Sequence, residues 1–464
     1  MHIKSKETFA SFLAGLAISI FIVTPVILNL FNILYPKECE SLAGQSQNEF
    51  QKKLDTLFPE RLQIVKELPY KTVPAEIPVH AQSAILIDAQ TGNILYKKNA
   101  DELIPPASMT KLVEMYVVLD ATEKGKISLD DKVPLPPQSW AINLPRDASI
   151  MFLAQGQQVT LRELLLGLSI ASGNDASIAV ANYVAGNMED FVMQMNSTVN
   201  ELGLKNTKFV ESSGYSEKNI TTAKEFAAFC KVYIERFPFA INDFHSQKVL
   251  RYPLEHNLPQ SQRAQGDGQA VVQYNTNKLL GKLEGCDGLK TGFIYESGYN
   301  IALTAKRGNR RFISVTMRGP GTGSAEGNKY RNEDGTALME FAFRKFAPYT
   351  DSEERKYSVP VLGSKVNSVN LVPAEDASFS VPFITGTDAE DCAKKVRTEI
   401  NIPSYIYGQV QQGAPYGQIV YKIDDTLLKS VPLVADRDSS RRFSLWRSSS
   451  FVRCIFASII PPPE

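Results

Sequence analysis

The chain has 464 residues, which is too long for one ordinary domain, so two or three folded units joined by linkers are expected. Apolar residues make up 43% of it and charged residues 22%, a composition typical of globular proteins with a buried core. Its 50 basic and 50 acidic side chains cancel to a formal net charge of zero, which gives no support to a nucleic-acid partner.

The cysteines and histidines show no spacing that indicates chemistry of their own. The five cysteines are far apart and form no Cys-x-x-Cys pair, so they are interpreted as separate thiols without a disulfide framework. None of the four histidines is paired at a metal-ligand spacing. The sequence therefore predicts no metal and no cofactor, and it gives little support to a Ser-His-Asp triad.

The N-terminal region contains a predicted membrane segment. Lys4 and Lys6 precede residues 12–34, an uncharged apolar run of 23 residues that is long enough to cross a bilayer as a helix. The apolar part of a cleaved signal peptide is shorter, about 7–15 residues, so an uncleaved anchor is favoured, although cleavage near residues 41–43 stays open. In both cases the positive flank stays inside and the rest is exported. Residues 35–74 are polar and are expected to form a stalk.

A Ser-x-x-Lys motif begins the first long apolar helix expected in the chain. Residues 83–88 and 94–96 are β-rich runs around a Gly/Asn turn, which predicts a hairpin, and two prolines at 105–106 end the extended segment. Apolar residues then recur at helical spacing. Ser108 and Lys111 are therefore expected on one face of the first turn of a buried helix. Alone, such a motif is most often a solvated helix turn.

Two further motifs follow in order. Ser172-Gly173-Asn174 lies in the expected turn between two helices, the first of which begins at a capping box, Thr160-x-x-Glu163. Lys290-Thr291-Gly292 directly precedes expected antiparallel strands at 299–306 and 311–317, and its glycine would let a substrate approach the backbone of a strand. Each motif is common by itself, but the ordered trio is typical of active-site serine enzymes that handle penicillin-like and D-alanyl substrates.

The pattern of elements predicts two folded domains. Strands before and after a helical middle indicate a mixed α/β domain over residues 75–346, with an antiparallel sheet flanked by helices. Beyond it, short strands without helices predict a C-terminal all-β sandwich domain over residues 356–435. The tail, residues 436–464, combines five arginines and three acids with many apolar residues, which suits contact with a membrane interface or a packed, frayed end.

The chain resembles the penicillin-binding D-alanyl-D-alanine carboxypeptidases, the low-molecular-mass branch of the serine β-lactamase and transpeptidase superfamily. The likeness extends from about residue 83 to residue 435. It is carried by the segments 87–92, 106–111, 172–176, 202–207, 275–280, 288–292 and 298–300. The resemblance implies a serine-type carboxypeptidase that removes the terminal D-alanine from peptidoglycan pentapeptides during cell-wall biogenesis, through an acyl-enzyme.

Roles for the motif residues follow from the resemblance and agree with their chemistry. Ser108 is a poor nucleophile until a base takes its proton, and Lys111 is the nearest base, provided that it is neutral. Burial and the second cation of Lys290 are expected to lower the pKa of Lys111. Ser172 is expected to relay a proton toward the departing amine, and Asn174 to orient the substrate and Lys111.

The third motif is expected to bind the substrate. Lys290 and Thr291 would hold the free carboxylate of the terminal D-alanine, on a strand that continues through Gly292 and Phe293. Backbone N–H groups of Ser108 and Phe293 would form the oxyanion hole. β-Lactams are expected as covalent inhibitors, and the protein is expected on the outer side of the bacterial cytoplasmic membrane.

Two alternative functions stay open. A β-lactamase is disfavoured because the sequence shows no further carboxylate loop that would activate a deacylating water. A non-catalytic peptidoglycan-binding protein is disfavoured because the motif side chains are intact.

Overall fold

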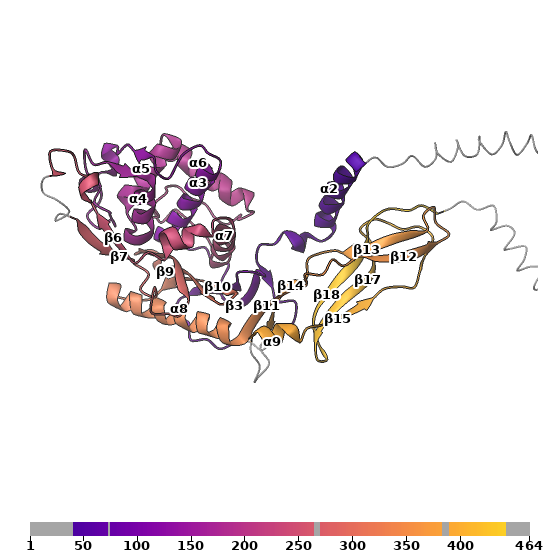
Figure 1. The fold of residues 1–464 in the computed structure, drawn as a ribbon. Helices are drawn as coiled ribbons and strands as arrows, with labels where there is room; N and C mark the ends of the chain where they lie inside the picture. Colours follow the sequence, from indigo (N-terminus) through magenta and orange to yellow (C-terminus); the bar gives the residue numbers. More distant parts are fainter. Residues whose placement is uncertain (1–39, 73–74, 264–269, 383–388, 442–464) are drawn as a thin grey trace, which may run out of the picture.

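The computed structural model describes residues 40–72, 75–263, 270–382 and 389–441, which form an α/β domain and a smaller β-rich domain (Figure 1). The predicted membrane segment at 12–34 lies outside these residues, and so does most of the tail at 436–464. Within the described ranges, no helix is both long enough and apolar enough to span a membrane.

The α/β domain is built on one sheet with the strand order β1-β3-β2-β10-β9-β8. Its strands are β1 (Lys66–Glu67), β2 (Ser83–Asp88), β3 (Asn93–Lys98), β8 (Cys286–Ile294), β9 (Gly298–Arg307) and β10 (Arg310–Gly319). Neighbouring strands are antiparallel, except that β1 runs parallel to β3. The predicted hairpin and the predicted antiparallel strand pair are both confirmed. The Lys-Thr-Gly motif lies on β8, at the edge of the sheet.

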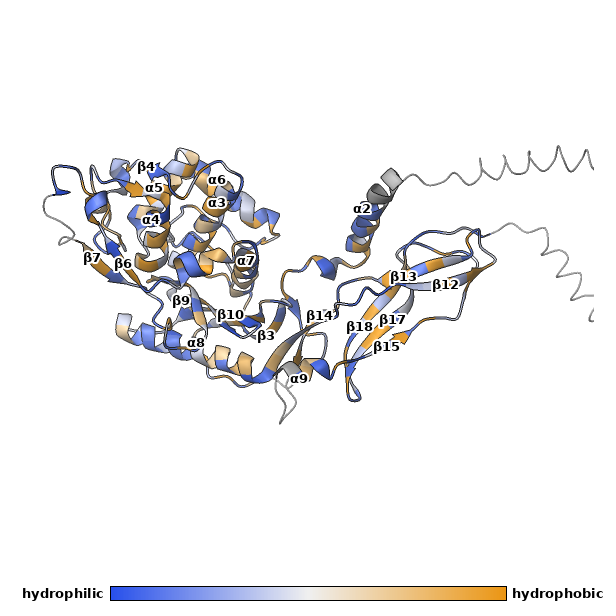
Figure 2. Cartoon of the chain, in the orientation of Figure 1, coloured by the Kyte–Doolittle hydropathy of each residue, from blue (hydrophilic) through white to orange (hydrophobic). Residues whose placement is uncertain are grey.

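The two faces of this sheet pack against different helices. Ile85 and Ile87 of β2 belong to one apolar cluster, while Ala84 and Leu86 belong to another, because side chains alternate across a strand. Helix α8 (Ser324–Lys345) covers the second face, and the helices of the middle of the chain cover the first (Figures 1 and 2). The predicted mixed α/β fold is therefore confirmed.

The helical layer carries the first two motifs. Its helices are α3 (Lys111–Glu123), α4 (Leu161–Leu166), α5 (Asn174–Ala185), α6 (Met188–Glu201) and α7 (Ala223–Arg236). Short strand pairs flank them: β4 (Lys132–Val133) with β5 (Val159–Thr160), and β6 (Val249–Tyr252) with β7 (Val271–Tyr274). Thr160 and Glu163 form the predicted capping box at the start of α4, and Asn187 and Thr222 cap α6 and α7 through their side-chain oxygens.

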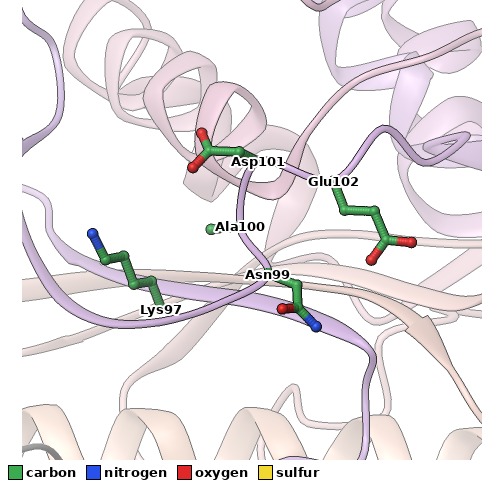
Figure 3. Close-up of a pocket in the computed structure, with 5 residues that line it drawn as sticks. All are labelled: Lys97, Asn99, Ala100, Asp101 and Glu102. Atoms are coloured by element: carbon green, nitrogen blue, oxygen red, sulfur yellow. The ribbon is translucent and has the colours of Figure 1, made fainter.

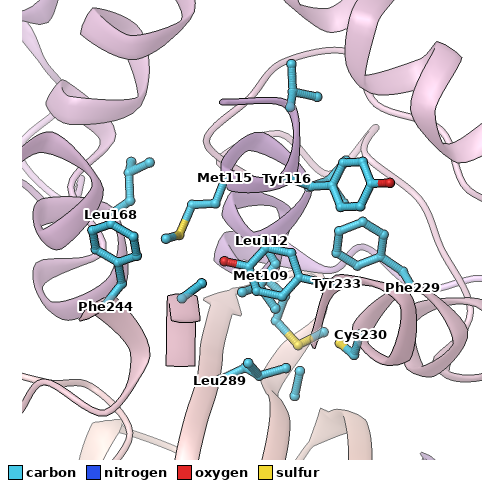
Figure 4. Packing of buried hydrophobic residues seen from close by; sticks show 14 of the residues in the cluster. Met109, Leu112, Met115, Tyr116, Leu168, Phe229, Cys230, Tyr233, Phe244 and Leu289 are labelled. Atoms are coloured by element: carbon cyan, nitrogen blue, oxygen red, sulfur yellow. The ribbon is translucent and has the colours of Figure 1, made fainter. Parts of the chain in front are cut away.

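Helix α3 passes through the centre of this layer and is buried on nearly all sides. Figure 4 shows Leu112 and Met115 of α3 among aromatic side chains from other segments, including Phe229, Tyr233 and Phe244. Burial of one such side chain stabilises a fold by about 1.5–3 kcal/mol. The helix that begins with the Ser-x-x-Lys motif is therefore a rigid part of the core.

Part of the segment predicted as a stalk packs against the folded domains. Strand β1 joins the main sheet beside β3, where Lys66 N donates to Gly92 O at 2.9 Å. Phe50 and Leu54 of helix α2 (Glu40–Leu57) pack into an apolar cluster of the C-terminal domain. The sequence did not indicate β1 because it has only two polar residues, and its pairing depends on backbone groups alone.

The C-terminal domain is built mainly from strands. Its six-stranded sheet has the order β15-β17-β18-β13-β12-β16, and β11 pairs separately with β14. The elements are β11 (Phe346–Thr350), β12 (Tyr357–Leu362), β13 (Ser368–Pro373), β14 (Ser378–Pro382), α9 (Ala389–Lys394), β15 (Arg397–Asn401), β16 (Ile406–Tyr407), β17 (Pro415–Ile423) and β18 (Thr426–Ala435). The expectation of strands without helices is wrong at α9, since a helix of six residues is too short for a visible period.

Ser380 of β14 fastens the C-terminal domain to the α/β domain. Its hydroxyl donates to Asp88 Oδ2 at 2.8 Å and lies 2.9 Å from the hydroxyl of Thr91. Its backbone N–H donates to Asn93 Oδ1 at 2.8 Å, and its carbonyl accepts from the Tyr70 hydroxyl at 2.7 Å. Ser380 is fully buried, so these hydrogen bonds form a buried contact between the two domains at the β2–β3 turn.

Candidate active site

The first motif places Ser108 and Lys111 at the start of α3. Residues Ala107–Thr110 form a 3-10 turn that leads directly into the helix, and Lys111 Nζ lies 3.2 Å from Ser108 Oγ. Ala107, just before the serine, has a φ of 51°, a left-handed conformation that is uncommon for a residue with a Cβ. Such strained residues persist where the surrounding packing enforces them, and they cluster at active sites.

Three oxygen atoms surround the amine of Lys111, whose side chain is fully buried. They are Ser108 Oγ at 3.2 Å, Asn174 Oδ1 at 2.7 Å and the carbonyl oxygen of Ser213 at 2.5 Å. A protonated lysine donates to all three. A neutral lysine donates to the two carbonyl oxygens and keeps a lone pair for the Ser108 hydroxyl proton. The carbonyl groups of Asn174 and Ser213 therefore aim this lone pair at the serine.

The surroundings of Lys111 shift its protonation toward the neutral form. Burial lowers the pKa of Lys111 to about 8, while the carboxylates of Glu114, Glu211 and Asp175 act in the opposite direction. The repulsion expected between the two lysines is seen in the pKa of Lys290. Burial is the main cause that lowers the pKa of Lys290 well below its usual range, and repulsion from Lys111 is the second cause. The two buried lysines thus disfavour simultaneous protonation.

Ser172 faces Lys290 from the turn between α4 and α5. It follows a π-helical turn, Gly167–Ala171, and adopts a left-handed conformation with a φ of 60°. Lys290 Nζ donates to Ser172 Oγ at 3.0 Å, and Lys290 is only 1% exposed. Helix α5 begins two residues after Ser172, and this brings Asn174 to Lys111.

Strand β8 presents the third motif beside the serine. Thr291 Oγ1 donates to Thr276 Oγ1 at 2.7 Å. A Cβ at Gly292 would lie 2.5 Å from Pro106 O and 3.1 Å from Ser108 N, so only glycine allows this approach of β8 to the serine backbone. Phe293 follows on the same strand, with a side chain 39% exposed.

Sequence reasoning missed the loop that contributes Ser213 and Gly214. Gly214 has a φ of 80°, and a Cβ there would lie 1.9 Å from Ala107 O and 2.8 Å from Ser108 N. The carboxylate of Glu211 holds the loop by accepting from Ser213 N and Oγ and from Gly214 N at 2.6–2.8 Å. Before the fold is known, a Ser-Ser-Gly run indicates only an ordinary turn. Its contact with Ala107 cannot be read from the sequence, because Gly214 and Ala107 are 107 positions apart.

The described residues contain a further surface pocket, of about 590 Å³, to which none of the motif residues contributes (Figure 3). It is lined by Lys97, Asn99, Ala100, Asp101 and Glu102. Glu102 forms an ion pair at 2.6 Å with Arg318, a residue just past the predicted strands. The motif residues themselves form two hydrogen-bonded groups: Ser108 with Lys111 and Asn174, and Ser172 with Lys290.

Comparison with known proteins agrees with both domains. Residues 70–321 match the family model of D-alanyl-D-alanine carboxypeptidase, and residues 343–441 match that of the penicillin-binding protein 5 C-terminal domain. The chain is 32% identical over 370 residues to D-alanyl-D-alanine carboxypeptidase DacF of Bacillus subtilis, covering 79% of this chain and 88% of the relative. It is 34% identical over 365 residues to DacC of Escherichia coli, covering 77% and 83%.

A solved structure gives the same result. Penicillin-binding protein 5 of Haemophilus influenzae superimposes with a TM-score of 0.64 at 28% sequence identity, over 80% of this chain and all of the other. The matched regions include the whole site described above. The chain therefore belongs to the D-alanyl-D-alanine carboxypeptidase family of serine peptidases.

Proposed function

We propose that this enzyme removes the terminal D-alanine from peptidoglycan pentapeptides with Ser108 as the nucleophile and Lys111 as its general base. The observation that carries the proposal is the contact of 3.2 Å between Lys111 Nζ and Ser108 Oγ, with Asn174 and Ser213 accepting the other two hydrogen bonds of the amine. A base must be within hydrogen-bond reach of the proton that it takes.

Acylation begins with the proton of Ser108 Oγ passing to the neutral amine of Lys111. The Oγ lone pair then forms a bond to the carbonyl carbon of the penultimate D-alanine, and the carbonyl electrons move onto its oxygen. Backbone N–H groups of Ser108 and Phe293 stabilise this oxyanion. The close approach of Gly292 to Ser108 supports that pairing, because it brings the two backbone segments together. Loss of one oxyanion donor typically costs about 10²–10³-fold in rate.

Collapse of the intermediate releases D-alanine. The carbon–nitrogen bond breaks as Ser172 Oγ gives its proton to the departing amine, and Lys290, which donates to the same oxygen at 3.0 Å, stabilises the serine oxygen. The proton that Lys111 took from Ser108 then passes to the Ser172 oxygen, so that Lys111 is neutral again and Ser172 is restored. Water next attacks the acyl carbon while Lys111 takes its proton, the bond from the acyl carbon to Ser108 Oγ breaks, and Lys111 returns the proton to Ser108. The terminal carboxylate of the substrate binds Lys290 and the Thr291 hydroxyl, which makes the site select a free C-terminus.

The proposal is tested with diacetyl-Lys-D-Ala-D-Ala as substrate. Mass spectrometry of the products is expected to find loss of one alanine with the intact enzyme, and none with Ser108→Ala. A fluorescent penicillin should give a stable adduct that the same substitution abolishes. Rapid turnover of the drug would instead favour a β-lactamase. Absence of both adduct and cleavage in the folded, intact protein would favour a non-catalytic binding protein.

The enzyme is further proposed to act outside the cell while attached to the cytoplasmic membrane. The support is the uncharged run at 12–34 behind Lys4 and Lys6, and the basic, apolar composition of the 436–464 tail. The C-terminal domain would then hold the site at a distance from the bilayer. Membrane fractionation of the full chain tests this: replacing the 12–34 run by a cleavable signal should release the protein unless the tail also binds membrane.

A further inference from the structure

Two π-helical turns lie against each other next to the site. The first, Gly167–Ala171, leads directly into Ser172, and the second is Ile241–His245. Leu168 and Phe244, one from each turn, belong to the same apolar cluster (Figure 4). π-Helical turns are rare, and they occur frequently at functional sites. Neither turn belongs to any of the three motifs, so the contact between them is a feature that the proposed mechanism does not use.

Ser169 joins the two turns. It is the polar residue of the first turn, and it is fully buried. Its hydroxyl group donates to the carbonyl oxygen of Phe244 at 3.2 Å and lies 3.2 Å from Nδ1 of His245. A hydroxyl group has only one proton, so the N–H of the imidazole ring donates to Ser169 Oγ. Nε2 of His245 is then an acceptor, and the hydroxyl group of Tyr233 on α7 donates to it at 2.8 Å. Both ring nitrogens are bonded, which fixes the orientation of the ring.

The same histidine packs on strand β8, shortly before Lys290. A Cβ at Gly288 would lie 3.2 Å from Cβ of His245, so the backbone of the strand contacts this residue directly. His245 is fully buried. Burial, followed by the positive charge of Lys290, lowers the pKa of His245 to about 3, while a hydrogen bond with the backbone of Leu289 acts in the opposite direction. The ring is therefore uncharged at neutral pH, in agreement with one donating and one accepting nitrogen.

His245 thus contacts both segments that carry the second hydrogen-bonded group of the site. Ser172, at the end of the first turn, has a φ of 60°, and such a left-handed conformation persists where the surrounding structure enforces it. Lys290 Nζ donates to Ser172 Oγ at 3.0 Å, although the two residues are 118 positions apart. The contacts of His245 with Ser169 on one side and Gly288 on the other hold the turn and the strand at the separation that this hydrogen bond needs.

We propose that His245 is a positioning residue that keeps Ser172 Oγ at Lys290 and thereby in place to protonate the departing amine. The inference rests on the proposed role of Ser172 as the acid for that amine. Ser108 and Lys111 are held by α3 and the turn before it, so loss of the His245 contacts is expected to impair the proton transfer more than the nucleophilic attack. A misplacement of about 1 Å can reduce a rate by about 100-fold.

The test uses two substrates with different leaving atoms. Diacetyl-Lys-D-Ala-D-Ala releases an amine, which must be protonated as it leaves. The thiolester analogue, with D-thiolactate in the last position, releases a thiolate, which needs no proton because thiols have a pKa of about 8.5. Both substrates keep the terminal carboxylate, so a change in binding at Lys290 affects them equally. The readout is the ratio of kcat/KM for the peptide to kcat/KM for the thiolester, since kcat/KM reports acylation.

Leucine and asparagine at position 245 form a matched pair of substitutions. The two side chains have nearly the same shape, and only asparagine keeps an N–H group near the place of Nδ1. His245→Leu should lower kcat/KM about tenfold for the peptide and less than about twofold for the thiolester. His245→Asn should keep the ratio within about threefold of the parent ratio. A merely structural role would lower both reactions in the same proportion, and that result would overturn the inference.

Ser172→Ala separates a failure of the inference from a failure of the proposed function. It should lower the peptide reaction at least about tenfold more than the thiolester reaction. Equal losses would overturn the proposed role of Ser172, and the inference with it. If Ser172→Ala changes the ratio and His245→Leu does not, the inference alone is overturned. If His245→Leu does not fold, Tyr233→Phe decides instead: the loss of the donor to Nε2 should lower the ratio about threefold, and an unchanged ratio would overturn the inference.

Tyr252→Phe is the control for the loss of a buried hydroxyl group. Tyr252 lies on β6 and donates to Gln157 at 2.8 Å, away from both π-helical turns in the chain. The substitution should lower the melting temperature and leave the ratio unchanged. A changed ratio would mean that destabilisation alone alters it, and this would overturn the inference.

Discussion

Asn174→Asp is the substitution that most sharply tests how its surroundings set the protonation state of Lys111. The new side chain has almost the same shape, but it places a carboxylate where Asn174 Oδ1 now lies, 2.7 Å from Lys111 Nζ. Opposite charges about 4 Å apart attract by about 4 kcal/mol at an effective dielectric constant of about 20, which equals about three pKa units. Burying the new carboxylate costs free energy, and this cost offsets about a third of the attraction to Lys111. The offset is not larger because the carboxylate lies at the start of α5, where the helix dipole favours an anion.

The expected result is a loss of activity that high pH restores. Lys111, with a pKa of about 8, must lose its proton before it can act, so activity rises with pH through that value. A new anion raises the pKa of Lys111, and the ascending limb should move up by about two pH units. Activity at pH 7 should fall about 100-fold and return to within a few-fold of the parent near pH 10.

The assay is D-alanine release from the dipeptide-ended substrate between pH 5 and pH 10.5. Asn182→Asp is a suitable control because Asn182 lies on the same helix and donates only to the Ile178 carbonyl. Its profile should match that of the parent enzyme. If Asn174→Asp is folded and its loss of activity is the same at every pH, Lys111 is not the group that titrates, and the reasoning fails.

Two further substitutions address the strained backbone and the joint between domains. Gly214→Ala should reduce acylation at least tenfold, because its Cβ would lie 1.9 Å from Ala107 O; Gly186→Ala has a similar positive φ but open space, so it should lower only the melting temperature. Acylation kinetics and thermal melts separate the two. Ser380→Ala removes the hydroxyl donor from Oδ2 of the buried Asp88 carboxylate, whose Oδ1 keeps the N–H groups of Gln90 and Thr91, and should destabilise the fold by about 1–3 kcal/mol. An unchanged melting temperature would contradict the importance of that joint.

The motifs allowed the sequence to predict most of the site, because their geometry is local. Ser108 and Lys111 lie three positions apart, in the 3-10 turn and the first residue of the helix that follows it, and the Ser172 turn and strand β8 were recognised from their own patterns. Short β-rich runs joined by Gly/Asn turns likewise predicted the β2–β3 hairpin and the β9–β10 pair. These features depend on residues close together in the chain, and so they leave a readable pattern.

The remaining parts of the site depend on contacts between distant segments. Ser213 presents a backbone carbonyl to Lys111 across 102 positions, and a carbonyl group leaves no trace in the residue type. Glu114 belongs to none of the three motifs, yet it is fully buried in α3. Its burial depends on Ser177 and Ser212, which only the packing of α5 and the 211–214 loop brings together. The sequence suggested that burial and the cation of Lys290 together lower the pKa of Lys111, and burial is the largest cause.

The most direct test of the central claim is to locate the acylated residue. The intact enzyme is incubated with benzylpenicillin, digested, and analysed by mass spectrometry of the peptides. We expect the added mass of the opened drug on the peptide that contains Ser108, with fragmentation placing it on that serine, and no added mass after Ser108→Ala. An adduct on any other residue, or release of D-alanine by Ser108→Ala at the parent rate, would contradict the account.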